Sequence, residues 1–259
     1  MRIAVEAVGV LAPGLAGWDE ARAVLAGGQP YVGGTMVPIE VASLPPAERR
    51  RSSPTVRLAI AVAEQALKRS PHAAADMAMV FASYEAAGVI THQLCEVLAG
   101  TREVSPTQFH NSVHNAPSGY YSIAMNVKHA AGSVCRGQWS FAAGLLHAAA
   151  VAIADELPVL FVCYDSPLPH PIDKVMPVIE STAIAMVLSA RADDRALAEW
   201  DVALGPGNGT AGWPAWMPGS WHANASARGF AALTTLADPA YKSADLPFSP
   251  ELNVRVTRC

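Results

Sequence analysis

The longest uncharged run of the chain, residues 139–154, places the strongest constraint on its fold. The run, WSFAAGLLHAAAVAIA, is rich in alanine and is closed by the acidic pair Asp155 and Glu156. Its 16 residues fall short of the ~20 apolar residues that cross a bilayer. A helix that is apolar on every side is normally buried inside a protein. The run therefore predicts a buried core helix, and no membrane span is expected.

Short apolar runs alternate with helical patterns along most of the chain. Strands are predicted at residues 3–10, 77–84, 157–167 and 180–190. Helices are predicted at residues 18–28, 54–69, 88–100 and 118–130. The arginine-rich stretch 43–54 is polar and bounded by prolines, which favours a solvated loop. The alternation of strands and helices indicates an α/β architecture.

The character of the sequence changes after Ala190. Residues 203–250 are rich in glycine and proline and contain a cluster of tryptophans. This composition is compatible with a loop-rich flap packed on its own domain, and equally with an extension that docks on another chain. We expect a domain over residues 1–204 and a C-terminal extension over residues 205–259.

Charged residues are scarce in this chain. They make up 15% of it, against ~25% in a typical soluble domain. Such a composition excludes disorder over the whole chain and suggests that a large partner interface, depleted in charge, covers part of the surface. The net charge of -4 argues against nucleic acid as a partner. The four cysteines lack zinc-type spacing and are interpreted as reduced thiols of a cytoplasmic protein.

Two short motifs imitate cofactor or metal sites but lack essential parts. The stretch GNGTAG matches the dinucleotide fingerprint, yet Pro214 and Pro218 prevent the helix that must follow it. The stretch HNSVHN places two histidines four residues apart but has too few ligands for zinc. No cofactor and no metal are expected. The polar side chains of this second stretch are interpreted as hydrogen-bonding groups: His110, Asn111, His114 and Asn115.

The apolar helix is preceded by a corner, Ser140 to Gly144, of the kind that holds a nucleophile in many enzymes. The chain has no GxSxG motif, no Walker A loop and no Ser-His-Asp arrangement. Cys135 is the best candidate nucleophile, because the neighbouring cation of Arg136 is expected to lower the pKa of its thiol. The alternative is a cysteine that only packs within its strand.

Four segments, in order along the chain, resemble the N-terminal half of β-ketoacyl synthases, the condensing enzymes with the thiolase fold. They are the first strand with its loop and helix (5–28), the arginine loop with an alanine-rich helix (45–67), the polar segment that starts the next helix (105–126) and a strand pair (181–204). The resemblance covers residues 1–204. It implies a thiolase-like, layered α-β-α fold of which this chain carries the N-terminal half only.

In active synthases of this family, the corner carries a cysteine that the N-terminus of the buried helix activates. With His147 as the anchor, the segment SFAAGLLHA aligns Ala142 with that nucleophile, flanked by Ser140, Phe141 and Ala143. Alanine has no atom to acylate. The two decarboxylating residues of the family lie in its C-terminal half, which this chain is expected to lack. The resemblance therefore implies that no catalytic residue is present.

This pattern is similar to that of chain length factors, the inactive subunits that pair with a competent synthase. More narrowly, it resembles short single-half proteins of aryl polyene and pigment clusters. The resemblance implies a non-catalytic subunit in polyketide, aryl polyene or fatty-acid-like biosynthesis. This subunit would form a heterodimer or higher heteromer with a β-ketoacyl synthase and would meet an acyl carrier protein indirectly. The side chains expected at the partner interface or acyl tunnel are His110, Asn111, His114, Asn115, Trp139 and Phe141.

Two alternatives remain at this point. One is a free-standing acyl-transfer enzyme that uses Cys135 or a serine as its nucleophile. The other is a homodimeric protein that binds acyl groups or small molecules without reacting with them.

Overall fold

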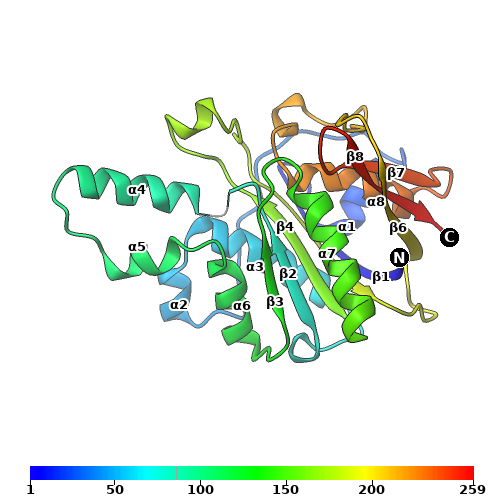
Figure 1. The fold of residues 1–259 in the computed structure, drawn as a ribbon, viewed down its shortest axis with the longest axis horizontal. Helices are drawn as coiled ribbons and strands as arrows, with labels where there is room; N and C mark the ends of the chain where they lie inside the picture. Colours follow the sequence, from blue (N-terminus) through cyan, green and yellow to red (C-terminus); the bar gives the residue numbers. More distant parts are fainter. Residues whose placement is uncertain (86) are drawn as a thin grey trace.

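The computed structural model describes residues 1–85 and 87–259. Within these residues, eight strands form one mixed sheet in the order β3-β2-β4-β5-β1-β6-β8-β7, with helices on both faces (Figure 1). Strands β3, β2 and β4 run parallel to one another, and the remaining neighbours are antiparallel. β3 and β7 are therefore the two edges of the sheet.

The described elements lie close to the predicted ones over the first 190 residues. The strands are β1 (Arg2–Leu11), β2 (Ala78–Ala82), β3 (Ala131–Val134), β4 (Val159–Asp165), β5 (Thr182–Ser189), β6 (Ala198–Pro206), β7 (Ser243–Pro247) and β8 (Leu252–Arg258). The helices are α1 (Trp18–Leu25), α2 (Pro46–Arg51), α3 (Pro54–Leu67), α4 (Gly88–Ala99), α5 (Pro106–Asn111), α6 (Ala116–Met125), α7 (Ser140–Asp155) and α8 (Gly229–Ala237).

Serine caps and prolines define where two of the helices begin. The hydroxyl of Ser53 accepts a hydrogen bond from the backbone N–H of Val56 at the start of α3, and Pro54 occupies the first helical position. Ser105 caps α5 in the same way. A serine cap satisfies a backbone donor that has no partner inside the helix, and proline at the first position loses no hydrogen bond.

Helices cover the sheet in two layers, which is the expected α-β-α architecture. α3 and α6 pack on one face, while α1, α7 and α8 pack on the other. The central strands are consequently buried on both sides. In β4, Leu160 and Val162 join the cluster beneath α3, whereas Phe161 and Cys163 join the cluster beneath α7. This is why these strands are continuous apolar runs rather than alternating patterns.

The long apolar helix lies along the sheet. By length and composition alone, residues Gly137–Asp155 are sufficient to cross a membrane. In the structure, α7 packs lengthwise against β2 and β4, with Leu145 and Ala148 fully buried. Its opposite side, which includes His147 and Ala150, is exposed. The predicted core helix is therefore confirmed for one face and is wrong for the other.

Several elements lie where no regular structure was expected. α2 falls within the arginine-rich stretch. α5 lies before the helix that was predicted at residues 118–130. Each has only six residues, which is too short for a helical hydrophobic period to show in the sequence. The C-terminal segment contributes α8, β7 and β8.

The C-terminal segment packs on the rest of this chain. β8 pairs with β6 and β7 pairs with β8, so the segment completes one edge of the sheet. α8 packs against α1 and β7. Trp221 stacks on Phe230 with 5.8 Å between ring centroids. The division at residue 204 itself stays a prediction, and β6 (Ala198–Pro206) runs across that position.

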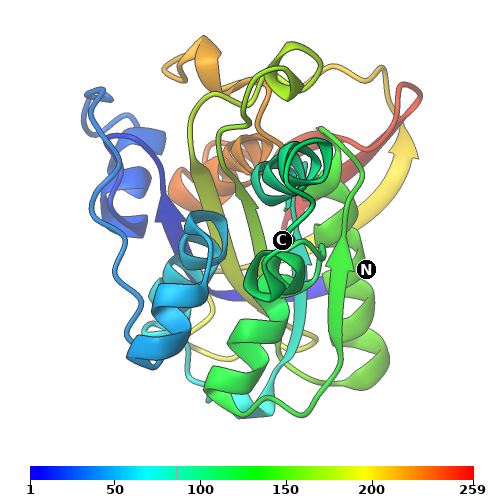
Figure 2. The ribbon, with the colours of Figure 1, turned by 90° about the vertical axis from the view of Figure 1, so that its left-hand side faces the viewer.

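Two helices extend beyond the sheet. α4 and α5 together form the arm, residues 88–111, which projects from the body in Figure 1 and is viewed from its tip in Figure 2. Within α4 only Gly88 is buried. Leu98 and Phe109 are 53% and 67% exposed. Because helices of this length are marginal without tertiary packing, the apolar side chains of the arm are suited to contact another surface.

Two helical glycines provide a matched test of this packing. A Cβ added at Gly144 in α7 would lie 2.6 Å from Phe161 and 2.8 Å from Ala82, whereas one added at Gly119 in α6 would meet nothing within 4 Å. We expect Gly144→Ala to lower the free energy of unfolding by about 1–3 kcal/mol through overpacking. Gly119→Ala should raise it by about 1 kcal/mol through helix propensity. Urea denaturation of both variants measures the difference, and equal effects would contradict the close approach of α7 to the sheet.

Candidate functional site

The parallel strands β2, β3 and β4 have their carboxyl ends on the same side of the sheet, and α/β proteins commonly bind ligands at such strand ends. Here β3 leads through a tight turn into α7. Gly137 occupies this turn with a φ of +56°, a left-handed conformation that glycine adopts without strain. The hydroxyl of Ser140 accepts a hydrogen bond from the N–H of Arg136 at 2.8 Å and donates one to the carbonyl of Gly137 at 2.7 Å. These bonds close the turn.

The residues assigned to the nucleophile corner lie inside the protein. Phe141 is fully buried, and Ala142 is 2% exposed in the first turn of α7. An acyl group therefore has no access to a side chain at position 142. Phe141 packs edge-on against Phe161, with 5.3 Å between ring centroids. The ring of Phe141 is thus part of the core of its own chain, and its predicted role at a partner's acyl tunnel stays a prediction.

Gln138 has an exposed side chain in the turn, and a distant residue binds it. Its Oε1 accepts a hydrogen bond from Nη2 of Arg228 at 2.8 Å, across 90 positions of sequence. Arg228 belongs to the 3₁₀-helix η4 (Ser226–Arg228), which leads directly into α8. A Cβ at Gly229 would lie within 2.5 Å of two carbons of the Phe141 ring. The chain's own C-terminal segment thus covers the start of α7.

Asp165, at the end of β4, anchors η4 to the sheet. Its carboxylate accepts hydrogen bonds from the N–H of Tyr84 at 2.8 Å and from the N–H of Ser226 at 2.7 Å. The Ser226 hydroxyl adds a third at 2.6 Å. Burial raises the pKa of Asp165 above its usual value of 3.8, and these hydrogen bonds partly oppose that shift.

Cys135 does not have the environment of an activated nucleophile. Partial burial raises the pKa of its thiol above the usual value, and the carboxylates of Glu85 and Asp165 raise it further. Arg136 points elsewhere: its Nε donates to the carbonyl of Phe248 at 2.9 Å, and its guanidinium lies 4.4 Å from the centre of that ring. The prediction that Arg136 lowers the thiol pKa is therefore wrong.

The HNSVHN segment is divided between several roles. Asn111 donates hydrogen bonds to the carbonyls of Arg51 and Thr107, as expected. The exposed ring of His110 meets Tyr120 edge-on at 5.9 Å. Both ring nitrogens of His114 are buried with no hydrogen-bond partner among the described residues, so hydrogen bonding is not confirmed there. The placement of this segment and of Trp139 at a partner interface stays a prediction.

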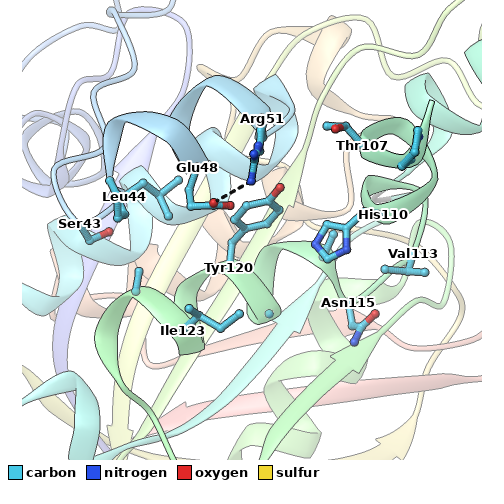
Figure 3. Close-up of a pocket in the computed structure, with 15 residues that line it drawn as sticks. Ser43, Leu44, Glu48, Arg51, Thr107, His110, Val113, Asn115, Tyr120 and Ile123 are labelled. Atoms are coloured by element: carbon cyan, nitrogen blue, oxygen red, sulfur yellow. Dashed lines mark hydrogen bonds and ion pairs between the residues drawn. The ribbon is translucent and has the colours of Figure 1, made fainter.

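A cavity of about 670 Å³ lies between α2, α5 and α6 (Figure 3). Tyr120 and Leu44 contribute apolar walls, and His110 and Asn115 of the HNSVHN segment also line it. The ion pair between Arg51 and Glu48, at 3.3 Å, stands on one side. Sequence reasoning missed this cavity because two of its three helices carry no readable pattern. It also missed Gln138 and Arg228, whose contact joins positions too distant in sequence to be related by any local motif.

The part of the sequence that identifies the family runs from α1 to just beyond β6. Residues 19–210 match the model of the β-ketoacyl synthase N-terminal domain. The chain belongs to this family. No curated protein matches the sequence.

Solved structures of low identity share the fold. One is a chain from the complex of a ketosynthase with its chain length factor from Xenorhabdus doucetiae, with 22% identity, a TM-score of 0.75 and full coverage of both chains. Another, from the ishigamide ketosynthase/chain length factor, has 13% identity and a TM-score of 0.72, with 100% of this chain and 99% of that chain covered. A β-ketoacyl synthase from Burkholderia phymatum has 14% identity and a TM-score of 0.63, with 82% of this chain and 66% of that chain covered.

The raised pKa of Asp165 predicts a characteristic pH dependence. A carboxyl whose pKa is higher in the folded state contributes stability that is present below its usual pKa of 3.8 and is lost as the pH rises through the folded value. Asp165→Asn should lower the free energy of unfolding by about 1–3 kcal/mol, because the amide leaves a buried donor unpaired. The difference in the free energy of unfolding between wild type and Asp165→Asn should become smaller as the pH rises.

Asp245 provides the control for this experiment. The hydrogen bond from Arg255 lowers the pKa of its carboxyl, so its contribution is present above the usual pKa and is lost as the pH falls. The gap for Asp245→Asn should widen as the pH rises. Urea denaturation over a pH series measures how each variant's difference in unfolding free energy from wild type changes with pH. Changes of the same sign for Asp165→Asn and Asp245→Asn would contradict the buried state of Asp165.

The thiol of Cys135 should react slowly at neutral pH. Its raised pKa keeps the thiol protonated, and the thiolate is the reactive form. Alkylation by iodoacetamide, followed by peptide mass spectrometry, should give a pH–rate midpoint above that of an ordinary cysteine. Arg136→Gln should leave this midpoint unchanged, and a large upward shift in that variant would show that the cation activates the thiol.

Proposed function

We propose that this chain is a non-catalytic β-ketoacyl synthase-like subunit, a chain length factor, that pairs with an active synthase. One observation carries the proposal: η4 and the start of α8 cover the corner at which the family's catalytic helix begins. Gly229 packs on Phe141 and Arg228 holds Gln138. At that corner Ala142 is buried and carries no nucleophilic atom, and the exposed Cys135 has a thiol whose pKa is raised.

The extent of the solved structures supports this proposal. This chain spans all, or nearly all, of two chains from ketosynthase/chain length factor complexes. The synthase from Burkholderia phymatum is longer, and 66% of it is covered. The pathway we propose is polyketide, aryl polyene or a related fatty-acid-like synthesis, with an acyl carrier protein met through the synthase.

The edge strand β3 supports pairing with a second chain. The backbone carbonyls of Ala130 and Val134 accept hydrogen bonds from β2. In a parallel strand, successive residues direct their backbone groups to opposite sides, so the N–H and carbonyl of Ser133 face outward. An unpaired edge is a template for another strand. In this proposal the synthase covers it.

Apolar side chains continue this surface onto the neighbouring helices. Ile123 on α6 is 83% exposed, and Val113 between α5 and α6 is 47% exposed. Ile123 lies on α6, which packs against β3, whereas Leu98 and Phe109 are exposed on the arm, which projects from the body (Figures 1 and 2). Exposed apolar patches of this kind mark interaction sites. The scarcity of charge in the chain has the same explanation, because interface cores are depleted in charge.

The four cysteines carry no disulfide in the described structure. Free thiols are typical of a reducing compartment, and we propose a cytoplasmic location on this ground.

A pair of exposed apolar residues tests the interface. We expect Ile123→Glu to weaken the complex with the synthase of the same gene cluster by about 100-fold, because the variant buries a charge without a partner. Tyr241, 55% exposed, lies near β7 at the opposite edge of the sheet, so Tyr241→Glu should leave binding unchanged. Co-purification and titration calorimetry measure both. A complex that tolerates Ile123→Glu and is disrupted by Tyr241→Glu would place the interface elsewhere.

Catalytic inactivity requires a separate experiment. The isolated chain should neither take up acyl groups from a thioester nor condense malonyl thioesters, whereas the synthase complex should do both. Intact-mass analysis after incubation with an acyl thioester detects an adduct. An adduct that disappears in Cys135→Ala would support the acyl-transfer alternative. A chain that stays homodimeric beside the synthase and binds acyl groups without reacting would support the other alternative.

A further inference from the structure

Arg228 carries a buried positive charge that no carboxylate of the described chain neutralises. Its side chain is 8% exposed, and no ion pair includes it in the described structure. Among the described residues Nε has no hydrogen-bond partner, and Nη2 donates to the neutral amide of Gln138. The ring of Trp213 lies 5.0 Å from its guanidinium carbon. Burial lowers the pKa of Arg228, with a smaller opposing effect of Tyr84. A buried charge without a counter-charge is strongly unfavourable.

The guanidinium points at the start of α7. Gln138 immediately precedes Trp139, the N-cap of this 16-residue helix. The N-terminus of a long helix attracts anions through the helix dipole. At the start of α7 the N–H groups of Trp139 and Ser140 already donate to the carbonyls of Arg136 and Gly137, so the dipole is the feature that acts here. Two independent features, a helix start and a buried unpaired arginine, therefore favour negative charge at one place.

The amide oxygen of Gln138 occupies the position that a carboxylate oxygen would take. A planar guanidinium binds a planar carboxylate through two parallel hydrogen bonds, whereas the amide accepts only one bond from Arg228. Gln138 is exposed and lies in the turn outside the helix, so its side chain is able to rotate away. Trp213 lies over the face of the guanidinium, so a ligand would approach its edge, where Gln138 now binds.

We propose that Arg228 and the start of α7 form an anion site for a small carboxylate, which displaces the Gln138 amide. The site recognises the carboxylate without reacting with it. This inference does not depend on pairing with a synthase, since every group that forms the site belongs to this chain.

The first test uses the isolated full chain, labelled with ¹⁵N-arginine, and two probes, malonate and inorganic phosphate. Malonate should shift the Nε–H resonance of Arg228 saturably at low ionic strength. Arg228→Gln should weaken malonate binding by at least about tenfold, because the charge-assisted fork is lost. Arg136→Gln removes an exposed cation two positions from Gln138 and should leave affinity unchanged. Calorimetry measures the affinities of both variants.

A built-in carboxylate provides the second test. Gln138→Glu should raise the melting temperature and abolish malonate binding. The rise in melting temperature should disappear when Gln138→Glu is combined with Arg228→Gln. The gain should be lost as the pH falls and the new carboxylate becomes protonated. Gln138→Ala, which removes the competing amide, should still bind malonate.

Three results would overturn the proposal. The first is the absence of saturable malonate binding to wild type and to Gln138→Ala. The second is tighter binding of phosphate than of malonate, which would exclude a carboxylate as the ligand class. The third is a stabilisation by Gln138→Glu that is equal with and without Arg228. If Arg228→Gln does not fold, malonate and phosphate titrations of wild type, Gln138→Glu and Gln138→Ala still decide the first two results.

Discussion

The buried carboxylate of Asp165 fixes the arrangement of the segments that meet at the start of α7. Through its hydrogen bonds to Tyr84 and Ser226, the end of β4 holds the end of β2 and the 3₁₀-helix η4 in one place. Without η4 in this position, neither Gly229 nor Arg228 would reach the first turn of α7. The low dielectric of the interior makes each of these hydrogen bonds strong and makes their loss correspondingly costly.

The start of α7 therefore combines the strand, turn and helix of its family with contacts from a distant part of the same chain. The strand, turn and buried helix have the form of the condensing-enzyme corner, but a Phe141–Gly229 contact and a Gln138–Arg228 hydrogen bond occupy it. A fold does not determine the chemistry of its sites. Here two parts of the chain pack against each other at the start of the helix, beside an arginine that forms no ion pair with the described residues.

The sheet has two different edges. β7 is joined to β8 by a hairpin and is flanked by α8, whereas β3 is short, partly exposed and continued by the apolar side chains of α6 and the arm. Open edges with adjacent apolar surface are unfavourable in a monomer. The scarcity of charge in the chain and the open edge at β3 are both compatible with the pairing that we propose.

Hydrophobic periodicity in the sequence was sufficient to identify the central strands, the long helices α3 and α7, and the α/β class, whereas the layered α-β-α arrangement was implied by the family resemblance. These elements bury continuous apolar faces, and such faces leave a direct record in the order of residues. The same record misjudged α7, because alanine is compatible with both a buried and an exposed helix face. It also missed α2 and α5, whose six residues each span too few turns to display a period.

The site itself was decided by tertiary structure. The sequence determined that a corner precedes a helix without an obvious nucleophile, since this follows from residue types at adjacent positions. Only the fold determined that Arg136 turns towards Phe248, that Phe141 lies inside the core and that Arg228 stands over Gln138. Each of these is a contact between residues far apart in the chain. A local pattern holds no information on such contacts, because they arise when the sheet brings β3, β4 and the C-terminal segment together.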